Sequence, residues 1–256
     1  MSGSINFDNA AEFYDATRSL PPEVQARVTE ILMPELAGRG PVLEIGIGTG
    51  RIALPLAARG VNLTGVDISE AMLARLGEKA DALGLRVPTR IADATELPFP
   101  DDSFDAGIAC HVFHLVRDWP RAVTELVRVV APGGVILVEA DSSGGLRSRF
   151  RDRVSEIVGD ERVTPDRLNT AEVEASFLEL GATVRHLPVV SWERERTVRG
   201  ALDELASNQW SMTWSIAEAL PAVVEQLTRE EEAARGDLDE PMVEEQRIAW
   251  RAYDLP

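Results

Sequence analysis

The sequence is poor in the residues that most often bind metals or form covalent cross-links. It has 256 residues but only one cysteine, Cys110, and three histidines, His111, His114 and His186. A single thiol cannot form an internal disulfide or a cysteine-based metal cluster. The three histidines form no recognisable ligand set, so we expect no metal site.

Positive charge is also scarce. Lys79 is the single lysine, and 26 basic against 43 acidic residues give a formal net charge of −17. A protein that follows the phosphate backbone of a nucleic acid needs many lysines and arginines to neutralise the phosphates. We therefore expect no nucleic-acid partner.

Long hydrophobic runs are missing as well. No run approaches the roughly 20 residues that a membrane-spanning helix requires. The first residues, MSGSINFDNAAEFYD, are polar and acidic and do not resemble a signal peptide. We expect a soluble, reduced, cytoplasmic protein without a membrane span. Nothing in the sequence indicates its oligomeric state.

The most informative stretch that the sequence does contain is PVLEIGIGTGRIALPLA, residues 41–57. A short apolar run is followed by the turn GIGTG and then by apolar residues at helical spacing, which predicts a strand, a tight turn and a helix. Glycines permit positive φ and close backbone approach to a ligand, and a helix start offers free N–H groups. This stretch therefore favours binding of the polar or anionic part of a ligand at the turn. A turn that binds no ligand would have the same local pattern.

The glycine spacing distinguishes between ligands. The dinucleotide fingerprint is G-x-G-x-x-G, whereas Arg51 stands here at its last glycine position. This disfavours an NAD-dependent oxidoreductase. With the acid Glu44, the string E-x-G-x-G-x-G resembles the first motif of class I S-adenosylmethionine (SAM)-dependent methyltransferases. The resemblance implies that cofactor contacts come from Glu44, Gly46, Ile47, Gly48, Thr49 and Gly50.

Two further acids follow predicted strands. Asp67 comes 17 residues after Gly50, and in nucleotide-binding α/β folds an acid at this place accepts hydrogen bonds from ribose hydroxyls. Asp93 follows the next apolar run, residues 88–92. Because the carboxyl ends of parallel strands line one crevice, we expect Glu44, Asp67 and Asp93 to meet there.

The segments around these acids extend the resemblance. VDIS resembles the second methyltransferase motif and adds Ile68, and ADATELPFPDDSFD resembles the segment whose acid takes the adenine amino group, here Asp93 beside Ala94. Met72 stands where adenine would lie, although a methionine in the core is the alternative. Asp93 could instead cap a turn.

The N-terminal segment FYDATR resembles the element of small-molecule methyltransferases that folds over the cofactor. The resemblance implies that Tyr14 and Arg18 contact the cofactor, with Arg18 on its methionine carboxylate, as an arginine fork suits a carboxylate. The alternative is a surface helix whose Phe13 and Tyr14 pack on the core.

The segment CHVFHLVRDW follows the predicted fourth strand, residues 105–109. We expect Cys110 and His111 to line the cofactor, and Phe113 and His114 to face the substrate. His114 is the candidate general base, since an imidazole titrates near neutral pH. It could instead simply pack or hydrogen-bond, because transfer from an activated sulfonium depends mainly on alignment.

The second half of the chain is less informative. Residues 143–256 predict a variable substrate half with a helical insertion at about 197–245, in which Trp210, Met212 and Trp214 form an apolar wall. This insertion is either a lid over the substrate or core packing. The arginines of LRSRFRDRVSEIV predict a solvated helix face or a site for an acidic substrate.

The predicted fold is α/β: a Rossmann-like, doubly wound, seven-stranded, mostly parallel sheet with a reversed last strand and a helical cap. We expect one domain over residues 1–256, with an N-terminal helical arm (1–40), a cofactor-binding half (41–142) and the variable half (143–256). The resemblance covers residues 12–142 and is to the small-molecule branch that includes ubiquinone- and menaquinone-biosynthesis methyltransferases.

That resemblance implies an enzyme that transfers a methyl group from SAM to oxygen, nitrogen or carbon of a small, partly apolar acceptor, with S-adenosyl-L-homocysteine (SAH) as product. The alternative is a non-catalytic SAM- or nucleotide-binding module that acts through partners. Turnover separates the two, because a binding module produces no SAH with any acceptor.

Overall fold

The computed structural model describes residues 8, 14–15, 19–142, 145–159, 170–207 and 211–256. These residues form two compact units, which we describe one at a time. The first unit comprises residues 1–141, 168–190 and 249–256, and the second comprises residues 142–167 and 191–248.

The described residues form an eight-stranded sheet in the order β3-β2-β1-β4-β5-β8-β6, with β7 paired to β8 outside this path. Its strands are β1 (Val42–Ile45), β2 (Leu63–Asp67), β3 (Thr89–Ile91), β4 (Phe104–Ala109), β5 (Val130–Ser142), β6 (Thr183–His186), β7 (Val190–Arg196) and β8 (Met242–Asp254). Parallel pairing joins β3, β2, β1, β4 and β5, whereas β8 runs antiparallel to β6. The predicted mostly parallel sheet with a reversed last strand is confirmed.

One strand more is present than the sequence predicts. Residues 183–192 predict a sixth strand broken by Pro188, and in the structure this stretch forms two strands, β6 and β7, with the break at residues 187–189. Pro188 lies in this break, and a proline cannot donate the hydrogen bond that a continuous ladder needs. The sequence predicts the last strand over residues 247–253, and in the structure it begins five residues earlier, at Met242.

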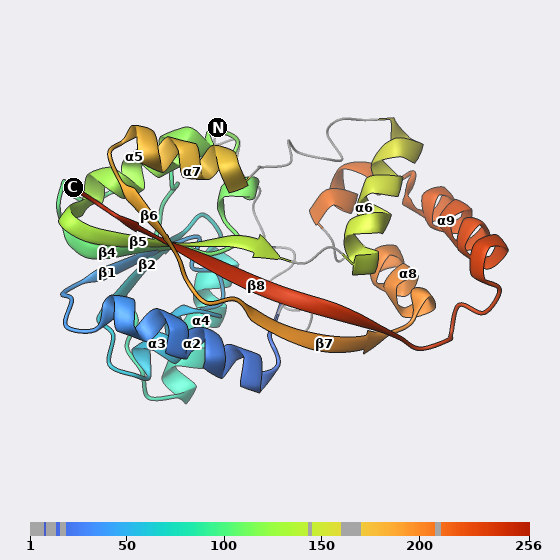
Figure 1. Cartoon of the computed structure of the whole chain (residues 1–256), viewed down its shortest axis with the longest axis horizontal. Coiled ribbons are helices and arrows are strands. Elements are labelled where there is room, and N and C mark those ends of the chain that lie inside the picture. Colours follow the sequence, from blue (N-terminus) through green and yellow to red (C-terminus); the bar gives the residue numbers. More distant parts are fainter. Residues whose placement is uncertain (1–7, 9–13, 16–18, 143–144, 160–169, 208–210) are drawn as a thin grey trace. The chain divides into compact units, whose positions relative to one another are not determined.

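Helices of the first unit are α2 (Pro22–Leu36), α3 (Ala53–Ala57), α4 (Glu70–Ala82), α5 (Trp119–Val129) and α7 (Thr170–Glu179), together with the short 3₁₀ helix η2 (Phe113–Leu115). In Figure 1, α2, α3 and α4 lie on one side of the strands and α5 and α7 on the other. This layering buries β1 completely, because all four of its residues are covered. The carboxyl ends of β1, β2 and β4 thereby become the fixed frame for the loops that follow them.

The second unit has its own hydrophobic core, built by α6 (Gly145–Val158), α8 (Val198–Ala206) and α9 (Leu220–Arg235). These three helices lie together in Figure 1. The arginines of α6 are engaged in ion pairs: Arg153 Nη2 lies 2.7 Å from Glu230, and Arg149 Nη2 lies 2.8 Å from Glu231, both on α9. These contacts favour the interpretation of a charged helix face over a site for an acidic substrate.

The predicted apolar wall falls largely outside what the structure describes. Trp210 lies outside the described residues, and the 3₁₀ helix η3 (Ser211–Ile216) follows it. Within η3, Trp214 is half-buried and Thr213 is buried. Among the described residues, no helix combines the length and the apolar character needed to cross a membrane.

Candidate functional site

The glycine-rich turn after β1 has the backbone geometry that its sequence predicts. Gly46 and Gly48 have φ angles of 61° and 54°, a region that residues with a Cβ seldom adopt. A Cβ on Gly46 would come within 2.5 Å of Val112 Cγ2, whereas a Cβ on Gly48 would meet nothing closer than 3.9 Å. Gly46 therefore allows tight packing, and Gly48 leaves an open approach to the backbone.

Asp67, the last residue of β2, holds this turn in place. Its Oδ2 accepts a hydrogen bond from the Gly48 N–H at 2.9 Å, and its Oδ1 accepts one from the Ser69 N–H at 2.9 Å. Burial raises the pKa of the Asp67 carboxyl, and these N–H groups oppose that shift. Each carboxylate oxygen has two lone pairs, so Asp67 retains acceptor capacity for ligand hydroxyls.

A pocket of ≈ 600 Å³, including its open mouth, lies at the carboxyl ends of these strands. From the turn and the arm, it is lined by Gly46, Gly48 and Tyr14. From the loops after β2, β3 and β4, it is lined by six further predicted residues, Asp67, Ile68, Met72, Ala94, Cys110 and His111.

Four predicted residues of the turn region and the β3 loop lie outside this lining. Ile47 is buried, and its side chain fills the space that a Cβ on Gly65 of β2 would need. Gly50 packs near Leu54 and Leu76. Thr49 is buried and donates a hydrogen bond to Asp15, and Asp93 has a local partner described below.

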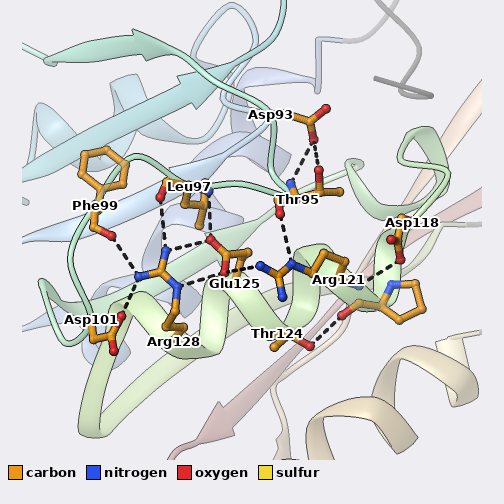
Figure 2. A network of polar contacts seen from close by, with 11 residues as sticks. Asp93, Thr95, Leu97, Phe99, Asp101, Asp118, Arg121, Thr124, Glu125 and Arg128 are labelled. Atoms are coloured by element: carbon orange, nitrogen blue, oxygen red, sulfur yellow. Dashed lines mark hydrogen bonds and ion pairs between the residues drawn. The ribbon is translucent and has the colours of Figure 1, made fainter. Parts of the chain in front are cut away.

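Asp93 takes part in the network that shapes the loop after β3 (Figure 2). Its Oδ1 accepts hydrogen bonds from the Thr95 N–H at 2.9 Å and from the Thr95 hydroxyl at 2.8 Å. This is the turn-capping role that the sequence left open for Asp93. The predicted contact of Asp93 with adenine remains a prediction.

Further along, this loop is fixed by a buried carboxylate on α5. Glu125 Oε2 accepts a hydrogen bond from the Leu97 N–H at 2.9 Å and one from Arg128 Nη2 at 2.7 Å. Arg128 also donates to the carbonyls of Leu97 and Phe99 and to Asp101. Figure 2 shows these side chains converging between α5 and the loop, so α5 positions the segment that carries Asp93.

The N-terminal arm is attached to the pocket at two aspartates. Asp15 Oδ1 accepts a hydrogen bond from the Thr49 hydroxyl at 2.6 Å and lies 3.0 Å from Lys79 Nζ. Asp8 Oδ1 accepts one from the Ser69 hydroxyl at 2.6 Å. These contacts place Tyr14 at the pocket, as predicted, whereas Arg18 lies outside the described residues.

Glu44 is buried beneath the turn, with 2% of its surface exposed. Its Oε2 has no hydrogen-bond partner among the residues that the structure describes. Burial raises the pKa of Glu44 to about 8, against the opposing effect of Arg51. With this pKa, Glu44 is mostly neutral at pH 7 even though Arg51 lies near it.

The sequence analysis missed a second buried acid, Glu139 on β5. Its Oε2 accepts a hydrogen bond from the Cys110 thiol at 2.8 Å and one from Arg51 Nη2 at 3.3 Å, and its Oε1 lies 2.9 Å from His111 Nε2. Burial alone would raise the pKa of Glu139, but His111 and Arg51 together lower it to about 2. Burial and the neighbouring Glu139 raise the pKa of Cys110, so its thiol stays protonated.

The two neighbouring histidines are placed differently. His111 lines the pocket and has a φ of 52°, whereas His114 is exposed on η2 and does not line the pocket. Their rings meet edge to face with centroids 6.0 Å apart. The predicted role of His114 as general base has no support from this placement.

The residues present fit the cofactor that the sequence motifs imply. Gly48 leaves the approach that a bound molecule needs, Asp67 has acceptors for hydroxyls, and Met72 with Ala94 supplies apolar surface for a flat ring. Glu44 lies outside the pocket lining, beneath the turn, and its Oε2, which has no partner among the described residues, suits an ammonium group. SAM carries a ribose, an adenine and an ammonium group, so its parts match these surroundings.

Comparison with known proteins identifies this region. Residues 43–138 match the methyltransferase-domain family. A phosphatidylethanolamine N-methyltransferase from Cereibacter sphaeroides is 43% identical over 101 residues, which are 39% of this chain and 49% of that protein. A demethylmenaquinone methyltransferase from Thermus thermophilus is 43% identical over 99 residues, 38% of this chain and 45% of that protein. The chain thus spans about half the length of these curated relatives.

Solved structures extend the likeness in fold beyond that region. The crystal structure of a putative methyltransferase from Bacillus halodurans covers 90% of this chain with a TM-score of 0.62 and 17% identity, and 99% of that protein is matched. At this identity the likeness concerns the fold. The family match, for its part, identifies residues 43–138 as a methyltransferase domain, in agreement with the class I, small-molecule methyltransferase predicted from the sequence, whose cofactor is S-adenosyl-L-methionine.

Proposed function

We propose that this protein transfers a methyl group from SAM to a small, partly apolar acceptor. The observation that carries the proposal is the single pocket region in which Gly48, Asp67, Met72 and His111 meet. Tyr14, Gly46, Gly48, Asp67 and Met72 would hold SAM, which supplies an activated methyl group.

The chain's own contribution is alignment and enclosure. The rigid ends of β1, β2 and β4 set the positions of the groups that bind the cofactor, and such positioning can account for much of the rate of a transfer reaction. On the β4 side, the pocket is lined by Val112, Leu115 and Val116, which exclude water and favour an apolar acceptor.

The names of the relatives support a small or lipid-like acceptor. The matched proteins include a phosphatidylethanolamine N-methyltransferase and a demethylmenaquinone methyltransferase. Both names denote acceptors that combine a polar part with an apolar part. We infer the same general class here, without choosing among oxygen, nitrogen and carbon as the methylated atom.

The test is turnover. The purified protein is incubated with SAM and fractionated small-molecule extracts, and SAH is quantified by mass spectrometry. An enzyme produces SAH in at least one fraction, in amounts that grow with time and with protein. A protein that binds SAH but never produces it would instead be the non-catalytic binding module.

Cofactor binding should also release a proton from Glu44. With a pKa of about 8, this carboxyl is mostly protonated at pH 7, and a ligand ammonium beside it would lower that pKa. We expect release of about one proton per SAH bound at pH 7. Calorimetric titrations in buffers of different ionisation enthalpy measure this number.

The matched control is Glu44→Gln, which has the same shape and cannot ionise. Its titration should show no proton release, and its binding should be weaker because the ammonium loses its counter-charge. Equal proton release in the variant and the wild type would show that the proton comes from another group and that Glu44 does not meet the ammonium.

A further inference from the structure

The pair formed by His111 and Glu139 has features that cofactor binding alone does not explain. Glu139 has 3% of its side chain exposed, yet it lies 2.9 Å from the imidazole of a residue that lines the pocket. A buried carboxylate is costly unless each oxygen has a partner. The contacts of the two Glu139 oxygens therefore indicate the role of this carboxylate.

The two oxygens of Glu139 contact different groups. Oε2 is occupied by the Cys110 thiol and by Arg51, which fix the carboxylate in the wall of the site. Within the described residues, Oε1 has no partner of full hydrogen-bond geometry, and the ionisable group that lies against it is the His111 imidazole, whose Nε2 is 2.9 Å away. A carboxylate oxygen at this distance favours the tautomer with the proton on Nε2, and in that tautomer Nδ1 keeps its lone pair.

The backbone of His111 supports a role in the site. His111 and Asp102 are the two non-glycine residues with positive φ in the described chain. A left-handed conformation costs a residue with a Cβ about 1–2 kcal/mol and is found where surrounding structure maintains it, often at functional positions. Here it turns the imidazole toward both the pocket and Glu139.

We propose that His111 is the proton acceptor of the methyl transfer and that Glu139 is its positioning residue. The proposal deepens the proposed function and rests on it. It also defines the substrate class: the acceptor's attacking atom carries a proton that it must lose, as in an alcohol, a phenol or an amine. Acceptors that react without losing a proton, such as thioethers, would not need this pair.

The step balances as follows. The acceptor heteroatom forms the bond to the methyl carbon with its lone pair. The carbon–sulfur bond breaks, and its electron pair goes to sulfur, which becomes the neutral thioether of SAH. The proton of the acceptor passes to Nδ1 of His111. The positive charge that leaves sulfur reappears on the imidazole beside Glu139, where the carboxylate stabilises it.

The other charged and titratable groups around His111 are compatible with this transfer. Arg51 is paired with Glu139 on the far oxygen, and the Cys110 thiol remains protonated. His114 contacts the His111 ring edge to face from η2. None of these groups competes for Oε1, which leaves Glu139 available to the imidazolium.

The first test uses sinefungin, a SAM analogue with an amine-bearing carbon where SAM has its methyl sulfonium. Its amine should lie at His111, so the wild type should prefer sinefungin over SAH. We expect His111→Asn to reduce that preference about tenfold or more, because a charged hydrogen bond is lost. Glu139→Gln should also reduce the preference. Asparagine is chosen because it tolerates positive φ.

The controls separate this inference from the proposed function. His186→Asn changes an exposed histidine on β6 and should leave the preference unchanged. Absence of SAH binding by the wild type would refute the proposed function itself. Two outcomes with normal SAH binding would refute only the role of His111. In one, His111→Asn does not change the preference for sinefungin; in the other, His114→Asn alone changes it.

The second test observes the proton directly. With only three histidines, the ¹⁵N-labelled imidazoles of the SAH complex can be assigned by single substitution. At alkaline pH we expect His111 to carry its proton on Nε2 and a lone pair on Nδ1, and Glu139→Leu to remove this fixed preference. A neutral His111 with its proton on Nδ1 has no lone pair to accept the acceptor's proton there and would overturn the proposal.

Discussion

Gly48→Asn should abolish most SAH binding while leaving the fold intact. The Cβ of residue 48 would project into open space, with nothing closer than 3.9 Å, so the protein itself can accommodate the side chain. That open space belongs to the pocket, and the added side chain would block close approach of a ligand to the backbone. We expect affinity to fall about 100-fold or more, which is about 2.7 kcal/mol. Calorimetric titration measures it.

Gly60→Asn is the matched control for this prediction. Gly60 also has positive φ, 89°, and a Cβ there would meet nothing within 4 Å. Both variants therefore carry the same kind of backbone strain and should lose a similar, small amount of stability. Only the pocket variant should lose SAH affinity. Equal loss in the two would mean that backbone strain, and not occupation of the pocket, weakens binding.

Glu125→Ala should produce the largest loss of stability. The Glu125 side chain is 5% exposed and is the acceptor for the Leu97 N–H and for Arg128. The Leu97 N–H would stay buried without an acceptor, which costs about 1–3 kcal/mol, whereas the partly exposed Arg128 keeps its bonds to Asp101 and to two carbonyls. For a chain of this size, each kcal/mol lowers Tm by about 2–4 °C. Thermal unfolding followed by circular dichroism measures the shift.

Glu78→Ala is the control, because Glu78 forms an exposed ion pair with Arg75 on α4. Loss of such a pair changes stability by about 0–1 kcal/mol. A shift for Glu125→Ala no larger than that for Glu78→Ala would contradict the role of Glu125 in fixing the loop after β3.

The same carboxylate should make the protein sensitive to acid. The hydrogen bond from Arg128, followed by that from the Leu97 N–H, lowers the pKa of Glu125 in the folded state. Its contribution to stability is therefore complete above the pKa of the unfolded chain and is lost as pH falls through the folded pKa. In Glu125→Ala, this part of the acid sensitivity should disappear.

Much of the site could be predicted from the sequence because its signals are local. Gly46 and Gly48 are two positions apart in one motif. Asp67 ends a short apolar run that predicts a strand. Both lie where strands of a parallel sheet end, so their meeting follows from the topology. Met72 and Cys110 are fixed in the same way by the helix and the strand that carry them.

Other parts could not be predicted, because they depend on contacts between distant segments. Glu139 sits in the apolar run VILVEAD, and its partner Arg51 is 88 positions away in the sequence. Which of His111 and His114 lines the pocket depends on the positive φ of His111. No local sequence pattern predicts a positive φ at a residue other than glycine here.

The most direct test of the account is a calorimetric titration of the full chain with SAH, with NADH titrated in parallel. We expect SAH to bind with a dissociation constant in the micromolar range and NADH not to bind. Binding of NADH without SAH, or no binding of either at concentrations well above that range, would contradict the assignment of this pocket to S-adenosylmethionine.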